Sequence, residues 1–131
     1  MTEPLHNHLV VRGEIRNPPQ DTEVAITLAR DLVEFLDMRI IQGPFAAYVT
    51  EPGNLGLTCL TMIETSHIAF HIWDETDPAL LQLDIYTCGL LNQTATIAKL
   101  KTLFDFTKIE YALFNRAEHL AYVTRPYLEI L

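Results

Sequence analysis

The sequence predicts an α+β fold, a two-layer sandwich in which two main helices cover one face of a largely antiparallel sheet. The chain has 131 residues, which suits one domain with its own hydrophobic core, so we expect residues 1–131 to form a single domain. Hydrophobic residues make up 49% of the chain and charged residues 20%, a composition typical of folded rather than disordered proteins. Two segments have helical periodicity, and the segments between them have the composition and alternation of strands.

The first helix is expected over residues 21–38 and the second from Asn92 to about residue 106. Asp21 or Thr22 can cap the first helix, and Asn92 can cap the second. Apolar residues recur at the spacing of one helical face in both segments. In the first helix this face consists of Val24, Leu28, Leu32, Phe35 and Leu36, and in the second of Ile97, Leu100, Leu103 and Phe104.

About six strands are expected, with turn signals between them. The E-P-G-N sequence at 51–54 and the polar loop D-E-T-D-P at 74–78 separate consecutive strands, which favours an antiparallel meander. The tail to Leu131 is apolar enough to be ordered. The expected strands are 8–14, 39–50 with an interruption at Gly43-Pro44, 57–63, 67–73, 80–87 and 109–114. The helices then cover one sheet face, and the other face is either solvated or meets a partner subunit.

Charge and cysteine content exclude several classes of protein. The net charge of -8, without clustered Lys and Arg, argues against a nucleic-acid partner. Neither Cys59 nor Cys88 lies in a CxxC pair, and the sequence has neither a secretory leader pattern nor an apolar run of membrane-spanning length. We therefore expect a cytoplasmic protein with free thiols and no membrane partner.

Reactive side chains gather in the segments around residues 66–73 and 81–88. Alternation places His67 and His71 on the strand face opposite Ile68, and places Cys88 on the face opposite Ile85. If these strands form a hairpin, matching their apolar faces brings His71 and Cys88 together on the uncovered face, with Cys88 about one residue from Ser66. We therefore expect Ser66, His67, His71 and Cys88 to converge near one end of the hairpin.

The spacing of Ser66 and His71 predicts an irregular backbone. The two residues are five apart, an odd number, so an ideal strand would direct them to opposite faces. A turn or bulge at residues 64–66 would allow both to serve one site. Simpler interpretations remain open, because a lone histidine or cysteine is often structural. We expect no metal site, since strand spacings of two and four without a carboxylate or cysteine pattern give a weak signal. The histidines weighed here are His6, His8, His67 and His71.

Two motifs together carry a family resemblance. S-H-I-A-F-H-I-W-D-E at 66–75, followed by L-D-I-Y-T-C-G at 83–89, resembles the bacterial and archaeal S-adenosylmethionine decarboxylases. The resemblance implies a pyruvoyl-dependent lyase that decarboxylates S-adenosylmethionine to supply aminopropyl groups for spermidine synthesis. The pyruvoyl group, which binds the substrate amine as a Schiff base, would form by autocatalytic cleavage at Thr65-Ser66, with no other cofactor and no metal. It also implies a homodimer through the open sheet face.

The resemblance assigns roles to individual residues. Ser66 matches the pyruvoyl precursor, Cys88 the residue that protonates the product carbon, and His71 a residue that assists processing. Thr58 stands where the family has a serine that helps processing, and Thr65 stands where it has glutamate. The substrate-binding candidates are Glu75, Trp73 and His67, while Phe70 is an aromatic candidate that the pattern assigns to the core.

Departures from the family pattern leave two alternatives open. Besides Thr65, Ile72 and Asp74 replace the threonine and proline of the family motif. One alternative is an unprocessed, inactive homologue that acts as a ligand-binding or regulatory partner. The other is a pyruvoyl-dependent arginine or ornithine decarboxylase, since the motif does not select among cationic amine substrates.

Overall fold

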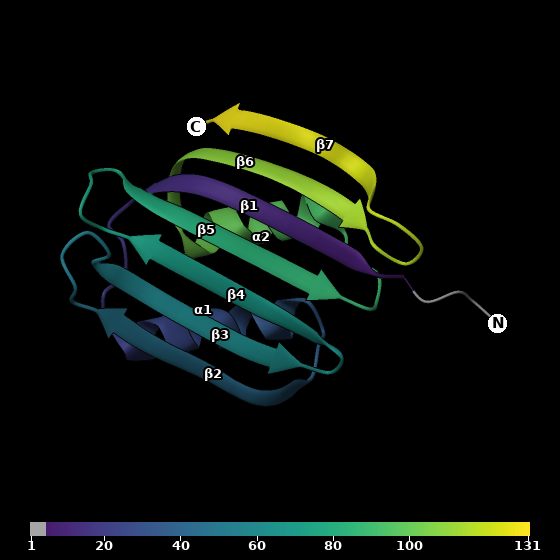
Figure 1. Cartoon of the computed structure of the whole chain (residues 1–131), viewed down its shortest axis with the longest axis horizontal. Coiled ribbons are helices and arrows are strands. Elements are labelled where there is room, and N and C mark those ends of the chain that lie inside the picture. The colour runs from purple at the N-terminus through teal and green to yellow at the C-terminus, as the bar shows by residue number, and fades with distance from the viewer. Residues whose placement is uncertain (1–4) are drawn as a thin grey trace.

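A computed structural model describes residues 5–131 and contains seven strands and two helices (Figure 1). The strands are β1 (Asn7–Arg16), β2 (Ile40–Val49), β3 (Gly56–Ile63), β4 (Ser66–Trp73), β5 (Ala79–Thr87), β6 (Asp105–Asn115) and β7 (Ala121–Ile130). The helices are α1 (Thr22–Phe35) and α2 (Gln93–Leu103). No helix in the described part of the chain is long and apolar enough to cross a membrane.

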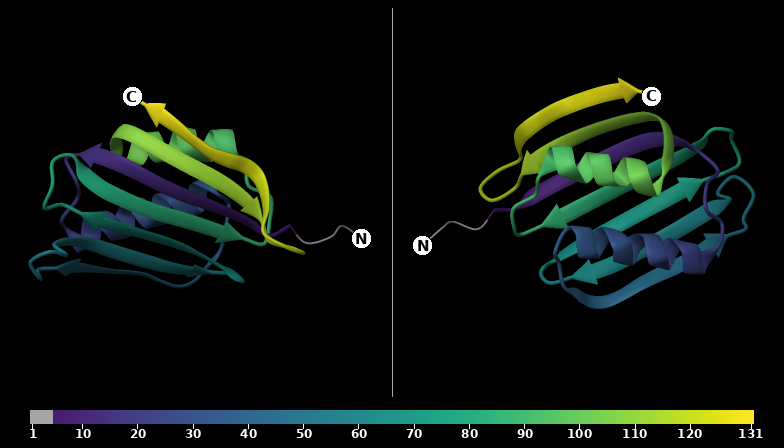
Figure 2. Two further views of the ribbon diagram at one scale, coloured as in Figure 1. Left: turned by 45° about the horizontal axis from the view of Figure 1, so that its top comes forward. Right: turned by 180° about the vertical axis from the view of Figure 1, so that it is seen from behind.

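All strands belong to one antiparallel sheet with the order β2-β3-β4-β5-β1-β6-β7. Both helices lie on the same face of this sheet, α1 behind β2–β4 and α2 behind the half that contains β1 and β6 (Figure 2). The predicted α+β sandwich is therefore confirmed. The tail, predicted only to be ordered, forms the edge strand β7.

The predicted face of the first helix is wrong by about one residue. Asp21 is the cap, because its side chain accepts a hydrogen bond from the Glu23 amide at 2.7 Å. Val24 and Phe35 are 46% and 44% exposed. The buried residues are Ala25, Ala29, Leu32 and Val33. Leu32 is buried as predicted, and Leu28 and Leu36 pack partly buried against the core. The small side chains of Ala25 and Ala29 occupy the centre of the buried face, and Val24 and Phe35 point away from it.

The second helix begins as predicted and ends earlier. The Asn92 side chain caps it by accepting from the Ala95 amide at 3.0 Å. Ile97 and Leu100 are buried as expected, but Phe104 has an extended backbone and leads directly into β6. Its ring packs edge-on against the buried Phe70, with 5.5 Å between ring centroids. Phe70 therefore belongs to the core and cannot contact a ligand on the open face.

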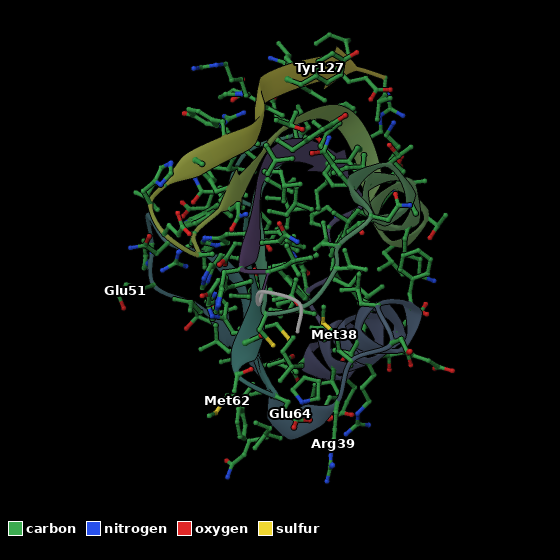
Figure 3. All side chains as sticks on the ribbon, turned by 90° about the vertical axis from the view of Figure 1, so that its right-hand side faces the viewer. Met38, Arg39, Glu51, Met62, Glu64 and Tyr127 are labelled. Carbon is green, nitrogen blue, oxygen red and sulfur yellow. The ribbon has the colours of Figure 1, made fainter. Side chains whose placement is uncertain are left out.

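The face of the sheet away from the helices is open and partly apolar. Its exposed hydrophobic side chains include Val10, Phe45, Val49, Leu60 and Met62. Figure 3 shows Met62 on the side of the sheet away from the helices. Exposed apolar residues gathered on one sheet face are typical of a surface that meets another protein, which is one of the two alternatives that the sequence left open.

Candidate active site

The β3–β4 connection is a two-residue turn with a strained backbone. Ile63 pairs with Ser66, so Glu64 and Thr65 alone connect the strands. Thr65 has a φ of 55°, in the left-handed region where glycine or asparagine is usual. An L-residue in this region carries a cost of about 1–2 kcal/mol. The irregular backbone predicted at 64–66 is confirmed.

Ser66, Thr65 and Cys88 form one group, which we call the turn cluster. The Cys88 amide donates to Ser66 Oγ at 3.1 Å, so the predicted approach of Cys88 to Ser66 is confirmed. Thr65 Oγ1 donates to the Glu64 carbonyl at 2.8 Å and lies 3.0 Å from Cys88 Sγ. Because the Thr65 hydroxyl hydrogen is used on the carbonyl, the Cys88 thiol is the donor in this second contact.

A cavity of about 340 Å³ adjoins the turn cluster. Its walls include the link between α1 and β2, where Met38 and Arg39 lie, and the Glu64 backbone amide donates to the Arg39 carbonyl at 3.0 Å. Figure 3 shows Met38, Arg39 and Glu64 at the same end of the molecule. The volume lies within the range of small-molecule sites, so a substrate can lie beside Ser66 and Cys88.

His71 is not part of this group, contrary to the sequence-based expectation. It pairs with Gln82 on β5 and with Thr58 on β3, five residues along β4 from Ser66. At about 3.4 Å per residue, this is a separation of roughly 17 Å. The short connection after Trp73 fixes the register of β4 against β5. His71 therefore lies near the loop end of this hairpin, whereas Cys88 follows the last residue of β5 at the opposite end. His71 and Cys88 can share an open face without being neighbours.

The residues near the β4–β5 loop form a second group, which we call the loop-end cluster: Thr58, His71 and Trp73. Thr58 Oγ1 and His71 Nδ1 are 3.1 Å apart, and the ring centroids of His71 and Trp73 are 6.1 Å apart. All three line a hollow of about 280 Å³. Glu75 lies at the same end, where it accepts from the Leu55 amide at 3.0 Å. Two of the three substrate-binding candidates, Trp73 and Glu75, are therefore remote from Ser66.

The third candidate, His67, belongs to a cluster that the sequence did not reveal. Asp84 Oδ2 lies 2.7 Å from His67 Nε2 and 2.8 Å from His8 Nε2. Burial by itself would raise the pKa of Asp84, but hydrogen bonds from His8 and His67 outweigh it and hold the pKa below its ordinary value. The three side chains come from β1, β4 and β5. Asp84 lies on the open face, opposite Val10 on β1 and Ala69 on β4, and only the sheet order brings β1 beside β5.

The His8, His67 and Asp84 group is also a candidate set of metal ligands, because its donor atoms lie within 4.8 Å of one another. Tyr86 lies between the two histidines in the sheet register. Arg116 stacks over the Tyr86 ring, 4.3 Å from its centroid, and its Nη1 lies 3.4 Å from His8 Nδ1. Of the three residues, His67 directly follows Ser66 in sequence, while His8 and Asp84 line a hollow of about 450 Å³ on the open face.

The residues around Ser66 fit a pyruvoyl group formed in place. Ser66 is the first residue of β4, and the rest of this strand is paired with β3 on one side and β5 on the other. Cleavage before Ser66 would therefore leave the new chain end anchored in the sheet, beside the Cys88 thiol. The exposed turn before it can separate without breaking these strand pairs.

Comparisons with known proteins bear on the family and on the fold. The S-adenosylmethionine decarboxylase family model matches residues 14–117, a span that includes the turn cluster and the loop-end cluster. The fold is similar to a crystal structure of the Trypanosoma brucei AdoMetDC-delta26 monomer, with a TM-score of 0.52 and 16% sequence identity. The match covers 87% of this chain and 47% of the trypanosome chain, so this chain spans about half the length of that relative. On the family match, the chain belongs to the S-adenosylmethionine decarboxylase family.

Proposed function

We propose that this chain cleaves itself between Thr65 and Ser66, and that the pyruvoyl group formed from Ser66 decarboxylates S-adenosylmethionine in the cytoplasm. The product would supply aminopropyl groups for spermidine synthesis. The observation that carries the proposal is the strained turn at Thr65, with Ser66 Oγ held by the Cys88 amide at 3.1 Å. This arrangement combines a hydroxyl, an adjacent peptide carbonyl and a source of strain at a single bond.

The turn residues prepare the peptide bond for cleavage. The Cys88 N–H fixes the Ser66 oxygen at the start of β4, next to the Thr65 carbonyl carbon that it must attack. The left-handed backbone of Thr65 raises the energy of the uncleaved chain, and cleavage releases that strain. Thr65 therefore contributes through its backbone even though its side chain differs from the family's glutamate.

After cleavage, the pyruvoyl group would supply the electron sink for loss of the substrate carboxylate. Cys88 holds a proton on Sγ, which the turn cluster keeps beside residue 66. It delivers this proton to the carbon that has lost the carboxylate, acting as a general acid. The adjoining cavity of about 340 Å³ holds the substrate in place for this transfer.

We further propose that the working unit is a homodimer in which the loop-end cluster of one protomer meets the turn cluster of its partner. Within one chain, Thr58 and His71 are hydrogen-bonded to each other but lie roughly 17 Å from Ser66. The apolar open face offers a surface for a second copy. A second copy would also bring the total length close to that of the trypanosome chain, which this chain half covers.

Mixed dimers test whether His71 acts across the interface. Neither Ser66→Ala nor His71→Ala alone should cleave. When the two are co-expressed, a hybrid dimer contains one site with Ser66 from one chain and His71 from the other, so the His71→Ala chain should be cleaved. Absence of cleavage in verified hybrids would show that His71 does not act in trans.

A second candidate function rests on Thr65. Threonine offers no acidic group where the family has glutamate, and its hydroxyl donates to the Glu64 carbonyl. If the chain never cleaves, it would serve as an unprocessed ligand-binding or regulatory partner of an active decarboxylase. Calorimetry of the intact chain with S-adenosylmethionine would detect binding without turnover.

The main test separates cleavage from catalysis. Denaturing electrophoresis should show two fragments of nearly equal size for the wild type and one full-length chain for Ser66→Ala. Carbon dioxide release should then be compared with S-adenosylmethionine, arginine and ornithine, and Cys88→Ser should cleave but release little. A chain that stays whole after prolonged incubation, or that acts on arginine or ornithine alone, contradicts the proposal.

A further inference from the structure

We propose that His8, His67 and Asp84 form a binding site for a divalent transition-metal ion, with Zn²⁺ as the best-fitting example. The site is built from three neighbouring strands, β1, β4 and β5, on the open face of the sheet. The proposal is independent of chain cleavage and of the decarboxylase reaction. It also replaces the sequence-based expectation of no metal site. That expectation was based on histidines without a carboxylate partner, and Asp84 provides the carboxylate.

The three donor atoms are close to the spacing that zinc requires. Both histidine Nε2 atoms lie 2.7–2.8 Å from Asp84 Oδ2, and all three atoms lie within 4.8 Å of one another. With metal–ligand bonds of about 2.0–2.1 Å in a tetrahedron, adjacent ligand atoms are roughly 3.3 Å apart. Each nitrogen–oxygen distance therefore has to lengthen by about half an ångström, and the two Nε2 atoms, which lie within 4.8 Å of each other, have to reach the same spacing. Side-chain rotations supply both changes.

The sheet holds the ligands in this arrangement without a ligand in place. His8 and His67 are both opposite Tyr86 in the strand register, one on each side of β5. Asp84 lies two residues further along β5 on the same face, so both imidazoles lean toward one carboxylate oxygen. Strand-borne ligands have little backbone freedom, so the entropy lost on binding a metal is small.

The donor set and the open fourth position indicate the class of metal. Two imidazoles and one carboxylate suit Zn²⁺ and its neighbours Co²⁺ and Ni²⁺, whereas Mg²⁺ and Ca²⁺ prefer oxygen ligands alone. His8 and Asp84 also line the hollow of about 450 Å³ on the open face. Water or an anionic group can therefore complete the coordination from that side, as in zinc sites with three protein ligands.

Arg116 opposes metal binding at this site. Its guanidinium can only donate, so the 3.4 Å contact with His8 Nδ1 places the His8 ring hydrogen on Nε2, toward Asp84. A metal on Nε2 requires that hydrogen to move to Nδ1, where Arg116 can no longer donate. The arginine charge also repels a dication. Other titratable groups around the site include His6 and Tyr86, whose side chains contact each other at 3.2 Å. Arg12 and His71 line the same hollow as His8 and Asp84.

Arg116→Gln should therefore tighten metal binding. A glutamine amide oxygen can accept from His8 Nδ1–H, which is the outer hydrogen bond that metal-bound histidines usually make. We expect a gain in affinity of about tenfold, at the lower end of the effects of such outer contacts. A role of the cluster as a hydrogen-bonded structural group predicts no gain.

The test is titration of the purified protein, cleaved or uncleaved, with Zn²⁺ by calorimetry and with Co²⁺ by visible absorption. One equivalent per chain is expected, with the absorption bands of Co²⁺ in a four-coordinate site. His8→Ala, His67→Ala and Asp84→Asn should each weaken binding by more than about 100-fold, since outer-contact changes already cost about 10–100-fold. His119→Ala and Cys88→Ser are controls for a histidine and a thiol outside the cluster, and both should bind like wild type.

Thermal unfolding without metal verifies that each variant is folded, and metal should raise the melting temperature of the wild type but not of the ligand variants. The proposal is overturned if the wild type binds no tighter than His67→Ala and Asp84→Asn, or if His119→Ala or Cys88→Ser removes the Co²⁺ signal. It is also overturned if Arg116→Gln weakens binding.

Discussion

Relief of the backbone strain at Thr65 should slow self-cleavage and stabilise the uncleaved chain. Thr65 is a β-branched residue at φ 55°, which stores about 1–2 kcal/mol in the turn. Glycine adopts this conformation without strain but adds unfolded-state entropy worth about 0.4–1 kcal/mol. In a Ser66→Ala background, which cannot cleave, Thr65→Gly should therefore raise the free energy of unfolding by roughly 0.5–1 kcal/mol. Asparagine, which tolerates this region without the entropy cost, should stabilise at least as much.

The same strain should appear in the cleavage rate. If most of it is released in the transition state, its loss slows cleavage by roughly 5–30-fold, since about 1.4 kcal/mol corresponds to a factor of ten. Urea denaturation measures the stability, and timed electrophoresis of freshly synthesised chain measures the rate. Asn17→Gly is the matched control, because Asn17 also has a positive φ of 50° but lies outside the turn. A Thr65→Gly chain that is less stable and cleaves as fast as wild type would refute the role of strain.

Three further predictions test the fold and the cluster chemistry. Gly56→Ala should strongly destabilise the chain in thermal unfolding, because the added Cβ would lie 1.7 Å from the Ile72 carbonyl oxygen; a melting temperature like that of wild type would show that the strands are spaced differently. Asp84 has a lowered pKa, so its contribution to stability is present above about pH 3.8 and is lost as the pH falls through the lowered value. Urea midpoints of Asp84→Asn should accordingly fall less steeply in acid than those of wild type, and parallel curves would contradict this. At pH 8, iodoacetamide should label only the exposed Cys88 in the folded chain, because burial raises the pKa of Cys59 to about 11; both should react in urea, and labelling of Cys59 in the folded chain would contradict its burial.

Local sequence patterns were sufficient for both helices, for strands β1 to β6 and for the turn cluster. Alternation and the polar loop at 74–78 predicted the β4–β5 hairpin, and the odd spacing of Ser66 and His71 predicted the irregular turn. Cys88 was correctly placed near Ser66, because hairpin register follows from the loop between the strands. These features depend only on residues close to one another along the chain.

Features that depend on position along a strand or on the order of strands in the sheet were missed. His71 was wrongly grouped with Cys88, because sharing a face says nothing about position along the strand. The His8–Asp84 contact requires β1 to lie beside β5, and the two strands are separated by some sixty residues of chain, so no local pattern indicates it. β7 gave a weak strand signal because Pro126, which lacks a backbone N–H, is tolerated only at a sheet edge.

The most direct test of the proposed function is the intact mass of the purified wild-type chain. The account predicts two species, one ending in a free carboxylate at Thr65 and the other beginning at residue 66. The second should be lighter by the mass of ammonia than a fragment that begins with serine, because the pyruvoyl group carries no amine. A single species with the mass of residues 1–131 after prolonged incubation would contradict the proposal that the Thr65-Ser66 bond breaks.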